Sequence, residues 1–143
     1  MKKILVAIIA LLFVGSASAQ FKVAEKQKTT EIVWTSFAGH QSIHAQELSN
    51  GEYYYWLVLK TSNQFDERIC IGIGVKDKAK ATLRQLENEL HKEGEIYQLI
   101  DDRGKPFTME CTTWNQYRIT KKGHAGYAYL TVGQASKMLS ALD

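Results

Sequence analysis

Proline, cysteine and serine-nucleophile motifs are scarce or missing in this sequence. Its 143 residues include one proline and two cysteines. The chain has no Gly-x-Ser-x-Gly turn and no Ser-x-x-Lys motif, so it shows neither of these nucleophile arrangements. It also lacks low-complexity tracts and linkers. We therefore predict one domain that is large enough to form its own core without disulfide staples.

A strongly basic balance is also missing once the first residues are set aside. The chain has 18 basic and 15 acidic residues. Lys2 and Lys3 belong to a segment that we expect to be removed, which leaves 18 − 2 = 16 basic residues and a net charge of +1. Nucleic-acid-binding proteins usually show a clustered basic face, so we expect no nucleic-acid partner.

Residues 1–19 have the three parts of a secretory signal peptide in order. A positively charged start precedes an apolar run over 4–14, and residues 17–19 are small, as at a cleavage site. The run is too short to span a membrane, so we expect no span after cleavage. The alternative is an uncleaved anchor or a buried helix. We predict an exported protein, periplasmic or extracellular, with a flexible arm over 20–30 and a single domain over 31–143.

The clearest local pattern is a strand that leads directly into a helix. Every second residue from 69 to 75 is apolar, which predicts a strand with one buried face. Apolar residues then recur every three or four positions over 78–93, which predicts an amphipathic helix. We expect Asp77 to cap the start of this helix and Gly94 to end it.

Several further segments have the composition or the period of strands. These segments are 31–37, 53–60, 96–100, 106–113, 114–120 and 126–130, and the conformation of 38–50 is left open. Thr131 and Gln134 form a capping box at the start of a second helix. We predict an α+β fold: an antiparallel β-sheet of about six or seven strands with two α-helices, over about 78–93 and 132–142, on one face.

The two predicted helices share one spacing of apolar residues. The matching residues are Ala79, Leu83 and Leu86 in the first helix, and Ala135, Leu139 and Leu142 in the second. An internal repeat would explain the match, but any amphipathic helix shows this spacing. Because a true repeat also matches in its turns, we favour chance as the explanation.

Cys70 and Cys111 leave two possibilities open. An oxidising compartment favours a disulfide between them. The strand patterns favour free thiols, because Cys70 lies opposite the apolar face of its strand whereas Cys111 shares a face with Phe107 and Met109. Sulfur atoms on opposite sides of a sheet cannot bond. We favour free thiols and keep the disulfide as the alternative.

His40, His44 and Glu47 are the candidates for a metal site. On a helix they would share a face, and two imidazoles with a carboxylate suit a zinc-like divalent metal. The histidine spacing resembles the zincin helix motif, but Gln41 stands where that motif has its general base, so we expect no proteolysis. In an extended segment the two histidines lie too far apart for one ion. The alternative is a pair of exposed surface histidines.

Aromatic residues are concentrated in the predicted strands. Tyr54 and Trp56 share one face of their strand, opposite the face that carries Leu57. With Trp114 and Tyr117 they are our candidate residues for binding a ligand or partner, because exposed Tyr and Trp are favoured at interfaces and stack on ligands. The alternative is that these rings are core residues or pack across neighbouring strands.

These observations predict a small exported non-enzymatic module that binds a protein or a glycan through an aromatic face of its sheet. One alternative is a metal-dependent hydrolase or a metal-binding protein that uses His40 and His44. A second is a structural or assembly subunit joined through sheet edges. The sequence leaves the identity of the partner and the oligomeric state open.

Overall fold

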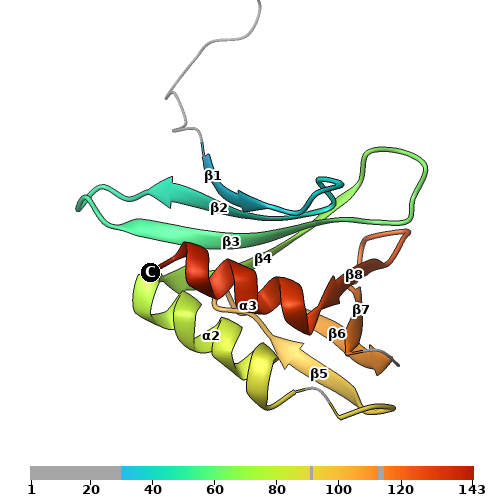
Figure 1. The fold of residues 1–143 in the computed structure, drawn as a ribbon. Coiled ribbons are helices and arrows are strands. Elements are labelled where there is room, and N and C mark those ends of the chain that lie inside the picture. Colours follow the sequence, from blue (N-terminus) through green and yellow to red (C-terminus); the bar gives the residue numbers. More distant parts are fainter. Residues whose placement is uncertain (1–29, 91, 113–114) are drawn as a thin grey trace, which may run out of the picture.

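The computed structural model describes residues 30–90, 92–112 and 115–143, so the predicted signal peptide lies outside the described residues. The described chain folds into strands and two helices, arranged as Figure 1 shows. The strands are β1 (Glu31–Thr35), β2 (Gln41–Glu47), β3 (Tyr53–Lys60), β4 (Arg68–Val75), β5 (Ile96–Ile100), β6 (Pro106–Thr112), β7 (Gln116–Thr120) and β8 (Ala128–Thr131). The helices are α2 (Lys76–Asn88) and α3 (Val132–Ala141).

The strands form two antiparallel sheets of four strands each. Sheet A has the order β1-β2-β3-β4 and sheet B the order β5-β6-β7-β8. The α+β class, the antiparallel pairing and the two helices are as predicted. The prediction of a single sheet of six or seven strands is wrong, because the described residues form eight strands in two sheets. The segment left open in the sequence contributes β2, which lies between β1 and β3.

The outer edge of β4 is closed by loops of the second half of the chain rather than by another strand. The Gly72 N–H donates to the Asp101 carboxylate at 3.0 Å, and the Gly72 carbonyl accepts from the Asp102 N–H at 2.9 Å. The Cys70 carbonyl accepts from Lys121 Nζ at 2.8 Å. Because these groups occupy the hydrogen-bonding edge, sheet A ends at β4.

Both halves of the chain repeat one order of elements, four strands followed by a helix. β1 and β5 have 5 residues each, and β2 and β6 have 7 each. Each helix follows its last strand with no residue between them. Ala79 and Ala135 occupy the same place in their helices, and both are fully buried. The shared spacing that we ascribed to chance therefore coincides with a repeated arrangement of elements.

Helix α2 starts and ends earlier than predicted. It begins at Lys76, so Asp77 lies in the first turn instead of at the N-cap, where its charge still favours the helix dipole. It ends at Asn88 rather than near residue 93. Gly94 has the expected left-handed conformation, with φ of 86°, but it lies in the loop before β5.

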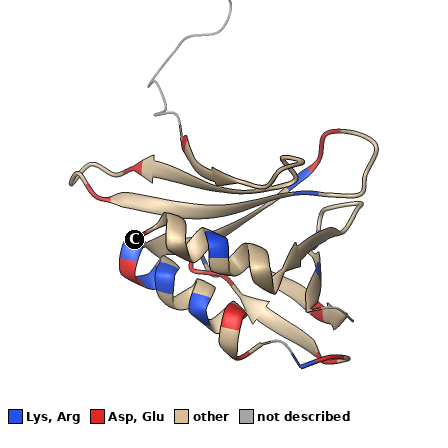
Figure 2. Ribbon diagram, in the orientation of Figure 1, with Lys and Arg blue, Asp and Glu red and all other residues tan. Residues whose placement is uncertain are grey.

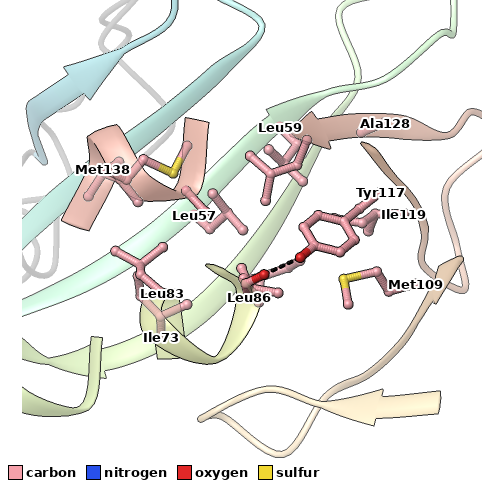
Figure 3. Packing of buried hydrophobic residues seen from close by; sticks show 14 of the residues in the cluster. Leu57, Leu59, Ile73, Leu83, Leu86, Met109, Tyr117, Ile119, Ala128 and Met138 are labelled. Carbon is pink, nitrogen blue, oxygen red and sulfur yellow. Dashed lines mark hydrogen bonds between the residues drawn. The ribbon is translucent and has the colours of Figure 1, made fainter. Parts of the chain in front are cut away.

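Two side chains of sheet B hold the C-terminal end of α2 and the loop after it. The Tyr117 hydroxyl donates to the carbonyl oxygen of Leu86, as the dashed line in Figure 3 shows. The Cys111 thiol donates to the Leu90 carbonyl at 3.1 Å. The last carbonyls of a helix have no intrahelical partner and need donors from elsewhere. Contacts distant in sequence therefore decide where this helix ends.

Helix α3 follows the sequence prediction closely. Thr131 Oγ1 accepts from the Gln134 N–H, and the Gln134 side chain accepts from the Thr131 N–H, both at 3.0 Å. This is the predicted capping box. Ala135 and Met138 are buried on the inner face of the helix. A local signal is sufficient here because both capping partners lie within four residues of each other.

One hydrophobic core is shared by the two sheets and the two helices (Figure 3). Its largest fully buried side chains are Tyr117, Ile43, Leu59, Ile69, Leu83, Met109, Ile119, Leu130 and Met138. Cys111 belongs to this core, whereas Cys70 is exposed, and both cysteines are free. Their strand positions predicted this placement on different faces.

Glu67 links the β3–β4 loop to the β7–β8 loop. Its carboxylate accepts hydrogen bonds from the N–H groups of Ala125 at 2.8 Å and Gly126 at 2.9 Å, and from the Thr61 hydroxyl at 2.8 Å. The two backbone N–H groups, followed by the hydroxyl, lower the pKa of Glu67 to about 2. A side chain at Gly126 would place its Cβ 2.7 Å from the backbone nitrogen of Asn63, so the two loops meet too closely for any residue except glycine.

Lysine and arginine residues gather along α2, as the blue segments of the ribbon in Figure 2 show. Lys78 pairs with Asp102 at 3.1 Å, and Lys80 forms an ion pair with Asp143. Two cations of this helix therefore have acidic partners. The Lys78 pair also joins the helix to the β5–β6 loop.

Candidate functional site

Tyr54 and Trp56 lie on the face of sheet A that points away from the helices. In Figure 1 both helices lie on the side of sheet A that faces sheet B. Leu57 points to that side and is buried in the core, so residues of the opposite parity point outward. In the register of β2 and β3, His44 lies opposite Trp56 and Gln46 lies opposite Tyr54. We call these four residues together with Arg103 the Tyr54–Trp56 surface.

The two rings of this surface are held at both polar ends. Their centroids are 5.2 Å apart and their planes are tilted by 56°. Trp56 Nε1 donates to Gln46 Oε1 at 3.1 Å, and the Tyr54 hydroxyl donates to Asp102 Oδ2 at 2.8 Å. Partial burial and then the bond to Asp102 raise the pKa of Tyr54 far above its usual range. Tyr54 is therefore a neutral hydrogen-bond donor at any ordinary pH.

Arg103 brings a positive charge to the rings from the second half of the chain. Its guanidinium carbon lies 5.5 Å from the centroid of the Trp56 ring and 6.0 Å from that of Tyr54, within the range of cation–π attraction. Gly72 allows this approach. A Cβ there would lie 2.5 Å from the Tyr54 hydroxyl oxygen and 2.7 Å from Arg103 Cγ. The close approach that Gly72 permits is therefore part of the site.

His44 is a neutral, hydrogen-bonded neighbour of the rings. Its Nε2 lies 3.1 Å from Ser42 Oγ and its Nδ1 lies 3.2 Å from Thr30 Oγ1. Burial, and then the positive charge of Arg68, lower the pKa of His44 below its usual value. A serine beside a neutral histidine suggests a nucleophile and its base. Ser42 is only 5% exposed, however, so its hydroxyl has little access to a substrate.

The helix on which the metal hypothesis depended is absent, because the segment is strand β2. His40 precedes the strand, and four residues of extended chain span about 13 Å, too far for both histidines to bind one ion. Glu47 and His44 have opposite parity in β2 and point to different faces. No group of three possible metal ligands occurs among residues 30–90, 92–112 and 115–143.

Tyr117 does not lie with Tyr54 and Trp56. Its side chain is fully buried in the core, because its position in β7 faces the helices. The sequence showed the aromatic character of this strand but not which of its faces is covered. Trp114 lies outside the described residues. Of the four candidate aromatic residues, the structure therefore brings together Tyr54 and Trp56.

A second pair of aromatic rings lies at the start of β8, where Tyr127 directly precedes the strand and Tyr129 lies within it. The rings of Tyr127 and Tyr129 meet edge to face, with centroids 5.3 Å apart. The guanidinium carbon of Arg118 lies 4.5 Å from the centroid of the Tyr127 ring. Tyr129 is exposed. Each sheet thus has, within or directly before one of its strands, a pair of aromatic residues two positions apart with an arginine beside it.

Sequence reasoning missed Arg103, Asp102 and Arg118 as parts of these surfaces. Arg103 and Asp102 lie in a turn 47 to 49 residues after the rings that they contact, and no local pattern connects the two segments. Gly72 was the available signal, because a glycine within a strand often marks the close approach of another segment.

The comparisons with known proteins add no functional assignment. The chain matches no family model, no curated protein and no solved structure. Over the residues that the structure describes, neither helix is long and apolar enough to cross a membrane.

Proposed function

We propose that this protein is a non-enzymatic binding module that engages a protein or a glycan through the Tyr54–Trp56 surface. One observation carries the proposal: two aromatic side chains and an arginine are held in place on a sheet face that no described helix covers. Trp, Tyr and Arg are the residues most enriched among those that dominate binding energy at interfaces.

The hydrogen bonds around the rings favour binding because they fix the rings before a ligand arrives. Gln46 holds the indole of Trp56 and Asp102 holds the phenol of Tyr54. Side chains that are already ordered lose less conformational entropy on association. We do not propose the opposite face of β3 as the binding surface, because Leu57 and Leu59 on that face are buried in the core.

The charges of the surface favour a partner that offers carbonyl or carboxylate oxygens. Arg103 is exposed and lies over both rings, and His44 is neutral because its pKa is lowered. Asp102 is already engaged by Tyr54 and Lys78. A protein surface supplies such oxygens together with apolar groups for the rings. A glycan is the second candidate, because its apolar ring faces stack on Trp and Tyr.

The proposal also places the protein outside the cytoplasm. The three-part pattern of residues 1–19 supports export. Partners in the periplasm or outside the cell are therefore the ones to test.

Photo-crosslinking from the sheet face tests the proposal in the producing cell. Ile32 is 59% exposed and pairs with His44, so a crosslinking amino acid at this position sits beside the Tyr54–Trp56 surface. We expect a discrete crosslinked product that is lost in the Trp56→Ala and Arg103→Ala variants. Tyr53→Ala is the matched control, because Tyr53 is an exposed aromatic of the same strand but points to the other face.

A glycan array probed with the same variants separates the two partner classes. Binding to a sugar that depends on Trp56 and not on Tyr53 would support a glycan partner. Purified variants must also be compared by thermal unfolding. If Trp56→Ala and Arg103→Ala lower the melting temperature while every interaction of the wild-type protein is retained, the rings are structural and the proposal fails.

A further inference from the structure

A cavity of about 180 Å³ lies between the two halves of the chain. Leu57 and Ile71 line it from the inner face of sheet A, Leu86 from α2, and Leu99 and Phe107 from sheet B. An apolar cavity of about 150 Å³ is large enough to hold a benzene molecule. This one therefore has room for one side chain of the size of leucine or phenylalanine.

Helix α2 and strand β5 form two walls of this cavity. Thr82 and Gln85 line it from the helix, and Leu99 and Ile100 line it from the strand. Thr82 and Gln85 make no side-chain hydrogen bond with any other residue that the structure describes. The cavity is thus bordered by polar groups that are available to a ligand and by one edge of sheet B.

The main-chain groups of β5 on this edge are unpaired within sheet B. The Cys111 N–H donates to the Glu95 carbonyl, and the Asp101 N–H donates to the Lys105 carbonyl. These bonds show that odd-numbered residues of β5 bond to β6. The N–H and carbonyl groups of the even-numbered residues, such as Gln98, must therefore point to the free edge.

The side chains of these even-numbered residues add an apolar border to the same edge. Ile96 is 60% exposed and Ile100 is 73% exposed, and both lie on the outer face of β5. Leu99, of opposite parity, points inward, and it borders the cavity together with Ile100 at the end of the strand. An extended chain paired with β5 would place alternate side chains on the isoleucines and into the cavity.

We propose that the groove between α2 and β5 binds an extended peptide segment, which adds a strand to the β5 edge and inserts one apolar side chain into the cavity. Strand addition of this kind obtains affinity from main-chain hydrogen bonds and specificity from a pocket for alternate side chains. Both parts are present here: main-chain donor and acceptor groups of Gln98 that bond to no residue of the described ranges, and a side-chain-sized cavity beside Leu99.

A single strand suits this groove better than a second copy of the protein. A second copy that paired through β5 would bring a whole sheet to the edge. The helix residues Thr82 and Gln85 line the same cavity, so α2 borders the space that such a sheet would need. An isolated strand has no further neighbours to accommodate.

This cavity and the Tyr54–Trp56 surface are neighbours that share Gly72 and Asp102, because both residues line the cavity and Asp102 also accepts from the Tyr54 hydroxyl. The rings of Tyr54 and Trp56 and the side chain of Arg103 are not among the lining residues. Trp56→Ala is therefore expected to leave peptide binding unchanged, and failure of one proposal does not decide the other.

Short blocked peptides with a leucine between two valines are suitable probes for a binding measurement by fluorescence polarisation. We expect saturable binding to the wild-type protein. Exchange of the central leucine for alanine should weaken it about tenfold, because most of the buried side chain is lost. Methylation of the two valine nitrogens should abolish binding, because in antiparallel pairing with the leucine opposite Leu99 these nitrogens donate to β5.

Gln98→Pro tests the edge from the side of the protein. Proline removes an N–H that points away from β6, so the sheet itself keeps its hydrogen bonds while strand addition is blocked. Gln98→Thr keeps the N–H and is the matched control. Thr82→Leu narrows the cavity. This variant should bind the leucine peptide more weakly than the wild-type protein does, without a lower melting temperature.

Three results would overturn the proposal. The first is the absence of binding by the leucine peptide up to about 1 mM, the weak end of specific recognition. The second is that the methylated peptide binds the wild-type protein as tightly as the unmethylated peptide does, or that Gln98→Pro binds the leucine peptide as tightly as the wild-type protein does. The third is a wild-type dimer in sedimentation experiments that Gln98→Pro converts to monomer, because β5 would then pair with its own copy.

Discussion

Removing the hydroxyl of Tyr117 should loosen the C-terminal end of α2. In Tyr117→Phe the Leu86 carbonyl loses the donor that the wild-type hydroxyl provides. Leu86 is 7% exposed and Tyr117 is fully buried, so water has little access to replace the bond. A buried polar group left without a partner costs about 1–3 kcal/mol, and the lower half of this range applies to a carbonyl. We expect a loss of about 1–2 kcal/mol in the free energy of unfolding.

Urea denaturation at neutral pH measures this loss. The slope of the free energy against urea concentration should stay constant while the midpoint falls, because the exposed surface is unchanged. Amide hydrogen exchange adds a local measurement: the N–H groups of Glu89 and Leu90, which donate to the Gln85 carbonyl, should exchange faster.

Tyr55→Phe is the matched control for this prediction. Tyr55 also packs against the core, but its hydroxyl makes no hydrogen bond with any described residue. Its removal should change the free energy of unfolding by only a few tenths of a kcal/mol, as is usual for substitutions away from such features. If both variants lose the same free energy, the bond to Leu86 contributes nothing and the explanation of the early end of α2 is wrong.

Other contacts between the two halves lead to further predictions. In the folded protein the pKa of Glu67 is about 2, below its usual 4.5. The contribution of Glu67 to the free energy of unfolding is therefore complete above pH 4.5 and disappears as the pH falls toward 2. In unfolding measurements, Glu67→Gln should make the fall of this free energy below pH 4.5 less steep. Gly72→Ala should cost about 1–3 kcal/mol of unfolding free energy, because the added Cβ meets Tyr54. Gly133→Ala should be neutral or stabilising in the same urea assay, because its Cβ would have no neighbour closer than 3.9 Å. A thiol reagent should modify Cys70 alone in the folded protein and Cys111 only after unfolding, because burial raises the pKa of the Cys111 thiol; the adducts are counted by intact mass.

Local patterns were sufficient to predict most of the elements. The alternation over β4 and the stripe of α2 each depend on residues within a few positions of one another, and the capping box of α3 lies within four residues. The sheets could not be predicted in this way. The alternation of β4 shows a buried face, but the groups that close its outer edge come from Asp101 and Asp102, about 30 residues later.

The same limit applies to the candidate site. The parity of β3 placed Tyr54 and Trp56 on the face opposite Leu57, and the structure has them there. Parity alone gave no way to decide which face of β7 the helices cover, so Tyr117 was grouped with the exposed aromatics although it is a core residue. The sequence could not decide whether His40 and His44 bind a metal, for a related reason. On a helix, histidines four positions apart can bind one ion, whereas in a strand they lie too far apart to do so.

The contacts that the sequence did not show follow one rule: side chains and loops of the second half complete elements of the first. Asp101 and Lys121 close the edge of β4, and Tyr117 and Cys111 hold the end of α2. The first half therefore cannot finish its own sheet edge or its own helix. Because these capping groups come from sheet B and its loops, the first half should reach its final structure only when the second half has folded against it. At the cavity between α2 and β5 the described residues of the second half leave space unfilled, and the proposed strand addition would complete the boundary there.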